Sequence, residues 1–173
     1  MWSWFTFWLL LHILTAIAAF GPTFAFPFIS GFAQRDPRNA LVVSEILHGI
    51  EARITLPAAV VMPFFGLALI YTGHVDLWKS DWLVISIGLY IVAFFFSAFV
   101  QQRNATKMVD LLKNMPAPPG PGEPAPVAGA AQGPPPAVAT LARQLNMGGI
   151  LITVLLVAII VLMVWKPGAA FTT

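Results

Sequence analysis

Four long apolar segments constrain the fold of this chain more than any other feature. The first lies within the charge-free run 1–34, and the others cover about 54–73, 82–102 and 148–165. A helix needs about 20 apolar residues to cross the hydrocarbon core of a bilayer. Only 9% of the residues are charged and 58% are hydrophobic, which is too apolar for a water-soluble surface. The sequence therefore predicts an all-α membrane protein, a four-helix up-down transmembrane bundle.

The segments between the spans divide the chain into three parts. Residues 1–115 would hold the first three transmembrane helices, with an amphipathic cytoplasmic segment between the first two and a helical extension after the third. Residues 116–136 contain nine prolines and predict a disordered cytoplasmic loop that contributes nothing to the fold. Residues 137–173 would form the fourth helix and a short tail. Within the first span, Pro22 and Pro27 predict a kink or a broken second half.

The loops between the spans differ in positive charge, and this predicts an orientation. With four spans, both termini and the second loop share one side, which holds only two of the nine basic residues, Lys79 and Lys166. The two longer loops hold the other seven and are therefore expected in the cytoplasm. All six tryptophans lie near the ends of the spans that face away from these two loops, as interfacial residues do. We expect a multi-pass protein of the plasma (inner) membrane with both termini outside.

His12 is the first candidate for a functional side chain. It lies about eight residues into the first span, roughly 12 Å below the outer surface at 1.5 Å per residue. An ionisable group at that depth is costly and should face the bundle interior. Two interpretations stay open: a neutral imidazole that is hydrogen-bonded to a neighbouring helix, or a cofactor-binding residue that would hold haem or a transition metal or relay protons.

Glu45, His48 and Glu51 form the second candidate. Steps of three residues place them on one side of a helix, where a carboxylate and an imidazole could share a divalent metal or a proton. The alternative is a solvated, paired helix face near the lipid headgroups. We estimate a separation of roughly 27 Å between His12 and His48 along the membrane normal, which excludes one haem held by both.

The motifs of the first two spans resemble a known family. The segments "LLLHILTAIAAFGP" and "IEARITLPAAVVMPFFGLALI" resemble the predicted integral membrane proteins of domain-of-unknown-function family 2269 over roughly the first three spans. The matching features are an early-helix histidine, a helix-breaking glycine, a Thr-Leu-Pro motif and a Gly-Leu pair: His12, Gly21, Thr55-Leu56-Pro57 and Gly66-Leu67. The Pro-rich insert falls outside this resemblance.

A more distant resemblance implies redox chemistry. The early-helix histidine is similar to that of four-helix copper-resistance D-like and protoporphyrinogen-oxidase-like membrane proteins. The latter pair this histidine with a lysine in a later helix. The third span here, 82–102, has no lysine.

The sequence shows no catalytic constellation, and it has no cysteine for a nucleophile or thiolate site. It favours a non-enzymatic structural or accessory membrane component over an enzyme. Its expected partners are the lipid bilayer and another membrane protein or a second copy; the net charge of +2 argues against nucleic acid. Two alternatives stay open: a redox, haem- or metal-handling protein (copper or iron) that uses His12, and a small transporter.

Overall fold

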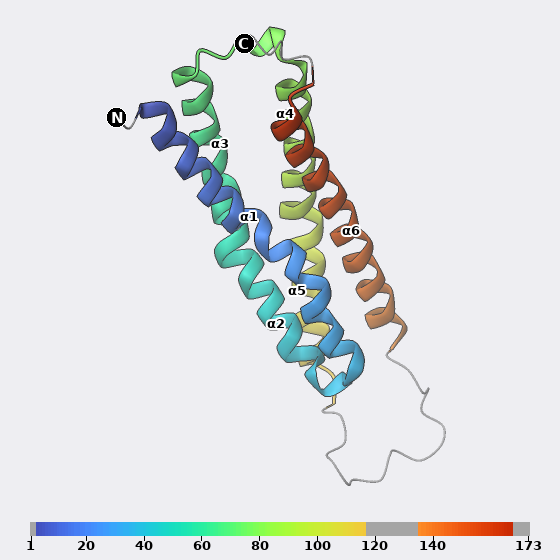
Figure 1. Ribbon diagram of the computed structural model, residues 1–173. Coiled ribbons are helices and arrows are strands. Elements are labelled where there is room, and N and C mark those ends of the chain that lie inside the picture. The colour runs from blue at the N-terminus through green and yellow to red at the C-terminus, as the bar shows by residue number, and fades with distance from the viewer. Residues whose placement is uncertain (1–2, 117–134, 168–173) are drawn as a thin grey trace.

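The computed structural model describes residues 3–116 and 135–167, and these residues contain helices and no strands. Within each of these two ranges, consecutive helices are joined by short turns or directly to one another (Figure 1). Their bounds are α1 (Trp4–Arg35), the 3₁₀ turn η1 (Pro37–Asn39), α2 (Ala40–Ile50), the π-helical segment η2 (Glu51–Thr55), α3 (Leu56–Thr72), the 3₁₀ turn η3 (Leu77–Lys79), α4 (Asp81–Phe95), the π-helical segment η4 (Phe96–Gln101), α5 (Gln102–Lys113) and α6 (Pro136–Trp165).

In the described part of the chain, four helical rods are long and apolar enough to cross a membrane: Trp4–Arg35, Pro37–Thr72, Asp81–Lys113 and Pro136–Trp165. Two of them are composite, because α2 continues through η2 into α3, and α4 continues through η4 into α5. Successive rods run in opposite directions, so the predicted four-helix up-down bundle is confirmed (Figure 1). The amphipathic lead into the second span and the helical extension of the third are confirmed as α2 and α5.

The first rod tests the sequence prediction of a kink or a broken second half. α1 is one helix of 32 residues that contains both Pro22 and Pro27. Each proline removes a backbone donor but leaves the rest of the ladder intact, so the chain bends without ending the helix. Figure 1 shows the axis of α1 changing direction near its middle. Of the two outcomes that the prolines predict, the kink is therefore the one present.

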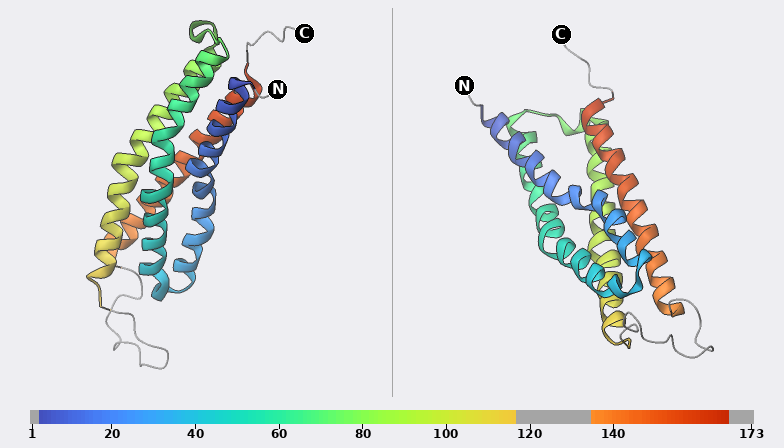
Figure 2. Two further views of the ribbon diagram at one scale, coloured as in Figure 1. Left: turned by 90° about the vertical axis from the view of Figure 1, so that its left-hand side faces the viewer. Right: turned by 60° about the horizontal axis from the view of Figure 1, so that its bottom comes forward.

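The bundle has two chemically distinct ends. At one end, which we call the tryptophan end, α1 begins, η3 joins the second and third rods, and α6 finishes (Figure 2). Lys166 lies there over the ring of Trp82, 5.5 Å from its centroid. At the other end, which we call the basic end, α1 turns through η1 into α2 beside the end of α5, and Arg35, Arg38 and Lys113 are found.

Packing follows the order of the rods. α1 lies along α3 and also contacts α2, α4 packs on α6, and α5 contacts both α2 and α6 (Figures 1 and 2). The buried centre is formed by Ile152, Leu156 and Ile159 of α6, with partly buried neighbours that include Phe20 and Tyr90. Most other large apolar side chains point outward, as expected where lipid is the solvent.

The sequence prediction for the Pro-rich stretch 116–136 concerns mostly residues 117–134, which lie outside the described residues. Its disorder, its lack of contribution to the fold and the three-part division of the chain therefore stay predictions. Pro136 is described, and it is the first residue of α6. At this position its missing N–H costs no helical hydrogen bond.

Candidate functional site at two facing π-helical segments

The π-helical segment η2 has a local cause in the sequence. Pro57 follows it closely, and a proline ring clashes with the carbonyl four residues earlier, here that of Arg53. Widening the preceding turn to a π-helix accommodates that clash, and the N–H of Leu56 bonds to the carbonyl of Glu51, five residues back. π-Helical segments are rare in proteins, and those that occur are often found at functional sites.

A hydrogen bond joins η2 to the second π-helical segment, η4. The Ser97 hydroxyl of η4 donates to Oε1 of Glu51 over 2.9 Å. Glu51 is only 9% exposed. The alternative interpretation from the sequence, a solvated helix face, is wrong for Glu51, because its side chain is buried and bonds to Ser97 of η4. Arg53, two residues later, faces outward.

The second contact of η4 is with α6. Gln101 is buried, and its side-chain Nε2 donates to the carbonyl of Leu145 over 3.1 Å. The same side chain lies directly against Gly148, where an added Cβ would overlap Oε1 and come within 2.7 Å of Cδ. Gly148 therefore lets η4 and α6 approach closely enough for this hydrogen bond.

Several buried polar atoms around the two π-segments have no hydrogen-bond partner within the described part of the chain. They are His48 Nδ1, Thr55 Oγ1 and Gln101 Oε1. His48, Glu51 and Thr55 follow one another at intervals of three and four residues, so they share a face of the second rod. Unpaired buried polar atoms of this kind are usually satisfied by water or a ligand.

The structure places the three predicted metal residues in different surroundings. Glu45 is exposed and forms an ion pair with Lys113 of α5, with 3.0 Å between Oε1 and Nζ. His48 is half-buried, and Glu51 is buried against Ser97. Among residues 3–116 and 135–167, no three His, Asp or Glu side chains converge as metal ligands would. A metal site that uses Glu45, His48 and Glu51 would need these side chains to rearrange, and it stays a prediction.

His12 lies in the other half of the molecule, between α1 and α3. Its imidazole packs on Gly66, where a Cβ would lie 3.4 Å from Cε1. Nδ1 is buried and has no partner among the described residues. Nδ1 is therefore the atom that a cofactor would use. Cofactor binding by His12 stays a prediction.

Between these two regions, a tyrosine compensates for a proline. Pro63 has no N–H, so the carbonyl of Ala59 loses its usual helical donor. The Tyr90 hydroxyl of α4 donates to that carbonyl. The phenol ring also lies near Phe20 of α1, with 6.4 Å between the ring centroids. Neither Tyr90 nor the η4 residues were predicted from the sequence, although a polar side chain inside an apolar run is a signal for an interior contact.

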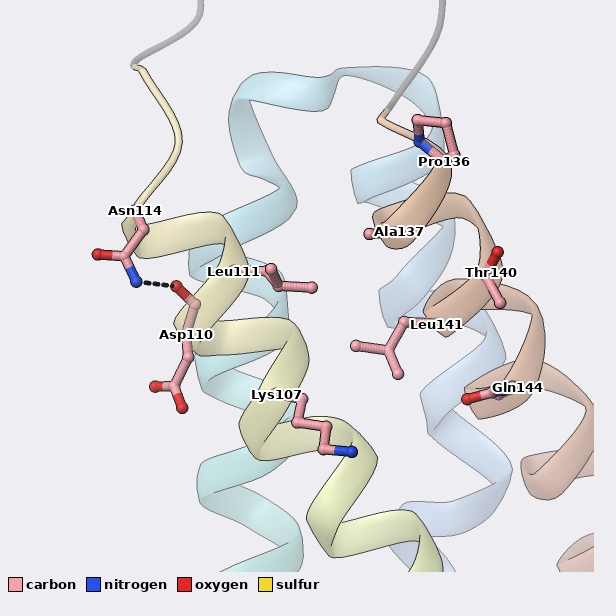
Figure 3. A pocket seen from close by; sticks show the side chains of 9 residues that line it. All are labelled: Lys107, Asp110, Leu111, Asn114, Pro136, Ala137, Thr140, Leu141 and Gln144. Carbon is pink, nitrogen blue, oxygen red and sulfur yellow. Dashed lines mark hydrogen bonds between the residues drawn. The ribbon is translucent and has the colours of Figure 1, made fainter.

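An open groove of about 600 Å³ separates the ends of α5 and α6 at the basic end. Leu111 and Leu141 point into it from opposite walls, whereas the amide of Asn114 turns away to bond the carbonyl of Asp110 (Figure 3). Lys107 is its one basic lining residue. The groove is wide open and does not bring together groups that could carry out a reaction.

The four apolar rods define the class, an integral membrane protein with four candidate spans. The family model described as "predicted integral membrane protein (DUF2269)" matches residues 6–167, and the chain therefore belongs to this family. The match confirms the resemblance and extends it beyond the first three spans to α6, across the Pro-rich insert that we expected to fall outside it. No curated protein and no solved structure matches the chain.

Proposed function

We propose that this integral membrane protein is a non-enzymatic structural or accessory component of its membrane. The observation that supports this proposal is the separation of its two most enclosed ionisable groups. His12 contacts α3 through Gly66, whereas Glu51 contacts η4 through Ser97. Each joins one pair of helices, and they do not converge on a common reaction centre. Catalysis normally needs several groups within hydrogen-bond reach of one reacting atom.

The outer faces of the rods support a role in assembly. Within the most apolar 18 residues of each span, only 11–22% are buried. The remaining surface faces lipid, a second copy or another membrane protein. We place the protein in the plasma (inner) membrane with both termini outside, because Arg38, Arg103, Lys107 and Lys113 belong to the basic end and positive residues are retained in the cytoplasm.

One observation favours a second candidate, a redox, haem- or metal-handling protein. Nδ1 of His12 is buried, unpaired among the described residues, and enclosed between two helices. The fit is incomplete, since the imidazole already packs on Gly66 and no second ligand side chain is described beside it. Copper, iron or haem would need a ligand from elsewhere.

A visible spectrum with metal analysis separates these two proposals. We expect the purified full-length protein to be colourless and free of stoichiometric copper or iron. His12→Ala should lower its thermal stability in detergent by about 1–2 kcal/mol, through the lost packing of the imidazole on Gly66. His74→Ala is the matched control, because His74 is exposed in the loop before η3.

A different outcome would favour the second candidate. A Soret band, or one copper or iron per chain, that disappears in His12→Ala and persists in His74→Ala would replace the accessory role with cofactor binding at His12.

A further inference from the structure

Among the carboxylates in the described part of the chain, Glu51 differs from the others in being buried without a cation. Asp76 pairs with Lys79 and Glu45 pairs with Lys113. Among the described residues, no Lys, Arg or His nitrogen lies within 4.0 Å of the Glu51 carboxyl group. Its described polar contact is the Ser97 hydroxyl, which donates to Oε1.

A carboxyl group in this position is far less costly when it carries a proton. Transfer of an isolated carboxylate from water to an apolar interior costs many kcal/mol, and one hydroxyl donor does not offset that cost. A neutral carboxylic acid can still accept the Ser97 hydrogen bond at one oxygen, and its own O–H adds a donor. An unpaired acceptor lies one turn along the same face: Thr55 Oγ1 is buried without a partner among the described residues.

The charged and titratable groups on the neighbouring elements are directed elsewhere. Arg35 lies at the end of α1, and Lys113 is held by Glu45. On α5, the remaining ionisable groups face outward: Arg103, Lys107 and Asp110. His12 of α1 contacts Gly66, and Tyr90 of α4 bonds the Ala59 carbonyl, both beyond Thr55 toward the tryptophan end. His48, one turn away on α2, is the nearest titratable neighbour on the same face.

The face of the second rod that carries Glu51 gives protons access to this residue from the basic end. Exposure falls along it from Glu45, whose side chain is 45% exposed, through half-buried His48 to Glu51 at 9%. His48 has a buried Nδ1 without a described partner, and imidazole exchanges protons readily near neutral pH. Beyond Thr55 the buried positions of this face are Ala59 and Met62. Polar groups therefore lead inward from the basic end and stop near the middle of the bundle.

We propose that Glu51 and Ser97 form a proton-binding site between the two π-helical segments, reached from the basic end past His48. The site takes up and releases one proton at the Glu51 carboxyl group. This proposal is independent of the accessory role, because it concerns η2 and η4 and not His12. It gives the Glu45–His48–Glu51 series a use that needs no metal: an exposed acid, a relay and a buried acceptor.

Infrared difference spectroscopy tests the proposal on the full-length protein in phosphatidylcholine vesicles. At neutral pH, we expect wild type minus Glu51→Gln to show the C=O stretch of a protonated carboxylic acid. Ser97→Ala should shift this band to higher frequency, because the hydrogen bond to Oε1 is lost. Glu45→Gln is the matched control and should remove carboxylate bands only, since Glu45 is exposed and paired with Lys113.

Two further readouts test the site without relying on the Glu51 variant. In the wild type alone, the acid band should give way to carboxylate bands as the pH is raised, because deprotonation removes the O–H. His48→Ala should retain the band but slow its shift on transfer to heavy water. The proposal is overturned if the Glu51 difference spectrum contains only carboxylate bands at neutral pH, including bands that depend on added Na⁺ or K⁺. It is equally overturned if no wild-type acid band responds to pH.

Discussion

Gly148→Leu is expected to destabilise the bundle by about 2–4 kcal/mol, since it combines overpacking with the loss of an interhelical hydrogen bond. A Cβ at position 148 would already lie 2.7 Å from Cδ of Gln101. Gln101 is 8% exposed and donates to Leu145, so its side chain cannot move aside without breaking that bond. Thermal unfolding in detergent, monitored by circular dichroism, measures the loss.

Gly149→Leu provides the matched control one residue further along α6. No described atom lies within 4 Å of a Cβ at position 149, so the added side chain enters open space. Both variants gain the same side chain in the same helix, and their difference isolates the contact with η4. In a Gln101→Ala background, Gly148→Ala should cost less than in the wild type. Equal stability of the two leucine variants would show that α6 does not approach η4 at Gly148.

Gly66→Leu is the second substitution with a large expected effect, about 1–3 kcal/mol, because it would push α1 away from α3. A Cβ at position 66 would lie 3.4 Å from Cε1 and 3.6 Å from Nδ1 of His12, which is ordinary contact. Gly66→Ala should therefore be tolerated, whereas the longer leucine side chain must displace the imidazole. The measurement is again thermal unfolding in detergent.

Gly88→Leu controls for the addition of leucine to a span. Gly88 of α4 is exposed and has no described atom within 4 Å of a Cβ. We also expect His12→Ala to relieve part of the cost of Gly66→Leu, since the smaller side chain leaves room. If Gly66→Leu and Gly88→Leu are equally stable, His12 does not pack on α3 as described.

The helical rods could be predicted from the sequence, because length and apolar composition are strong signals for a membrane span. The bounds of the second and third rods were harder to predict from the sequence. Glu51 and Arg53 are both charged and end the apolar window before Ile54, although only Arg53 faces outward. A charged residue that is covered by another helix cannot be distinguished, from composition alone, from one that faces water.

The candidate site depended on packing that the sequence does not display. Pro57 is a local signal for the distortion at η2, but Phe96–Gln101 contains no proline, and η4 has no comparable mark. The partners of Glu51 and Gln101, Ser97 and Leu145, lie more than 40 residues away along the chain. His12 was identified from its depth in the first span, and its contact with Gly66 required the α1–α3 packing to be known.

Single-cysteine labelling tests the four-span architecture most directly, because the chain has no cysteine of its own. Cysteines would replace Ser3, Lys79 and Lys166 at the tryptophan end, and Arg38 and Asn114 at the basic end. With a membrane-impermeant maleimide on intact cells, we expect the first three to react from outside and the other two only after permeabilisation. Reaction of the Lys79 and Asn114 variants from the same side would contradict this architecture, because the rod Asp81–Lys113 would then not cross the membrane.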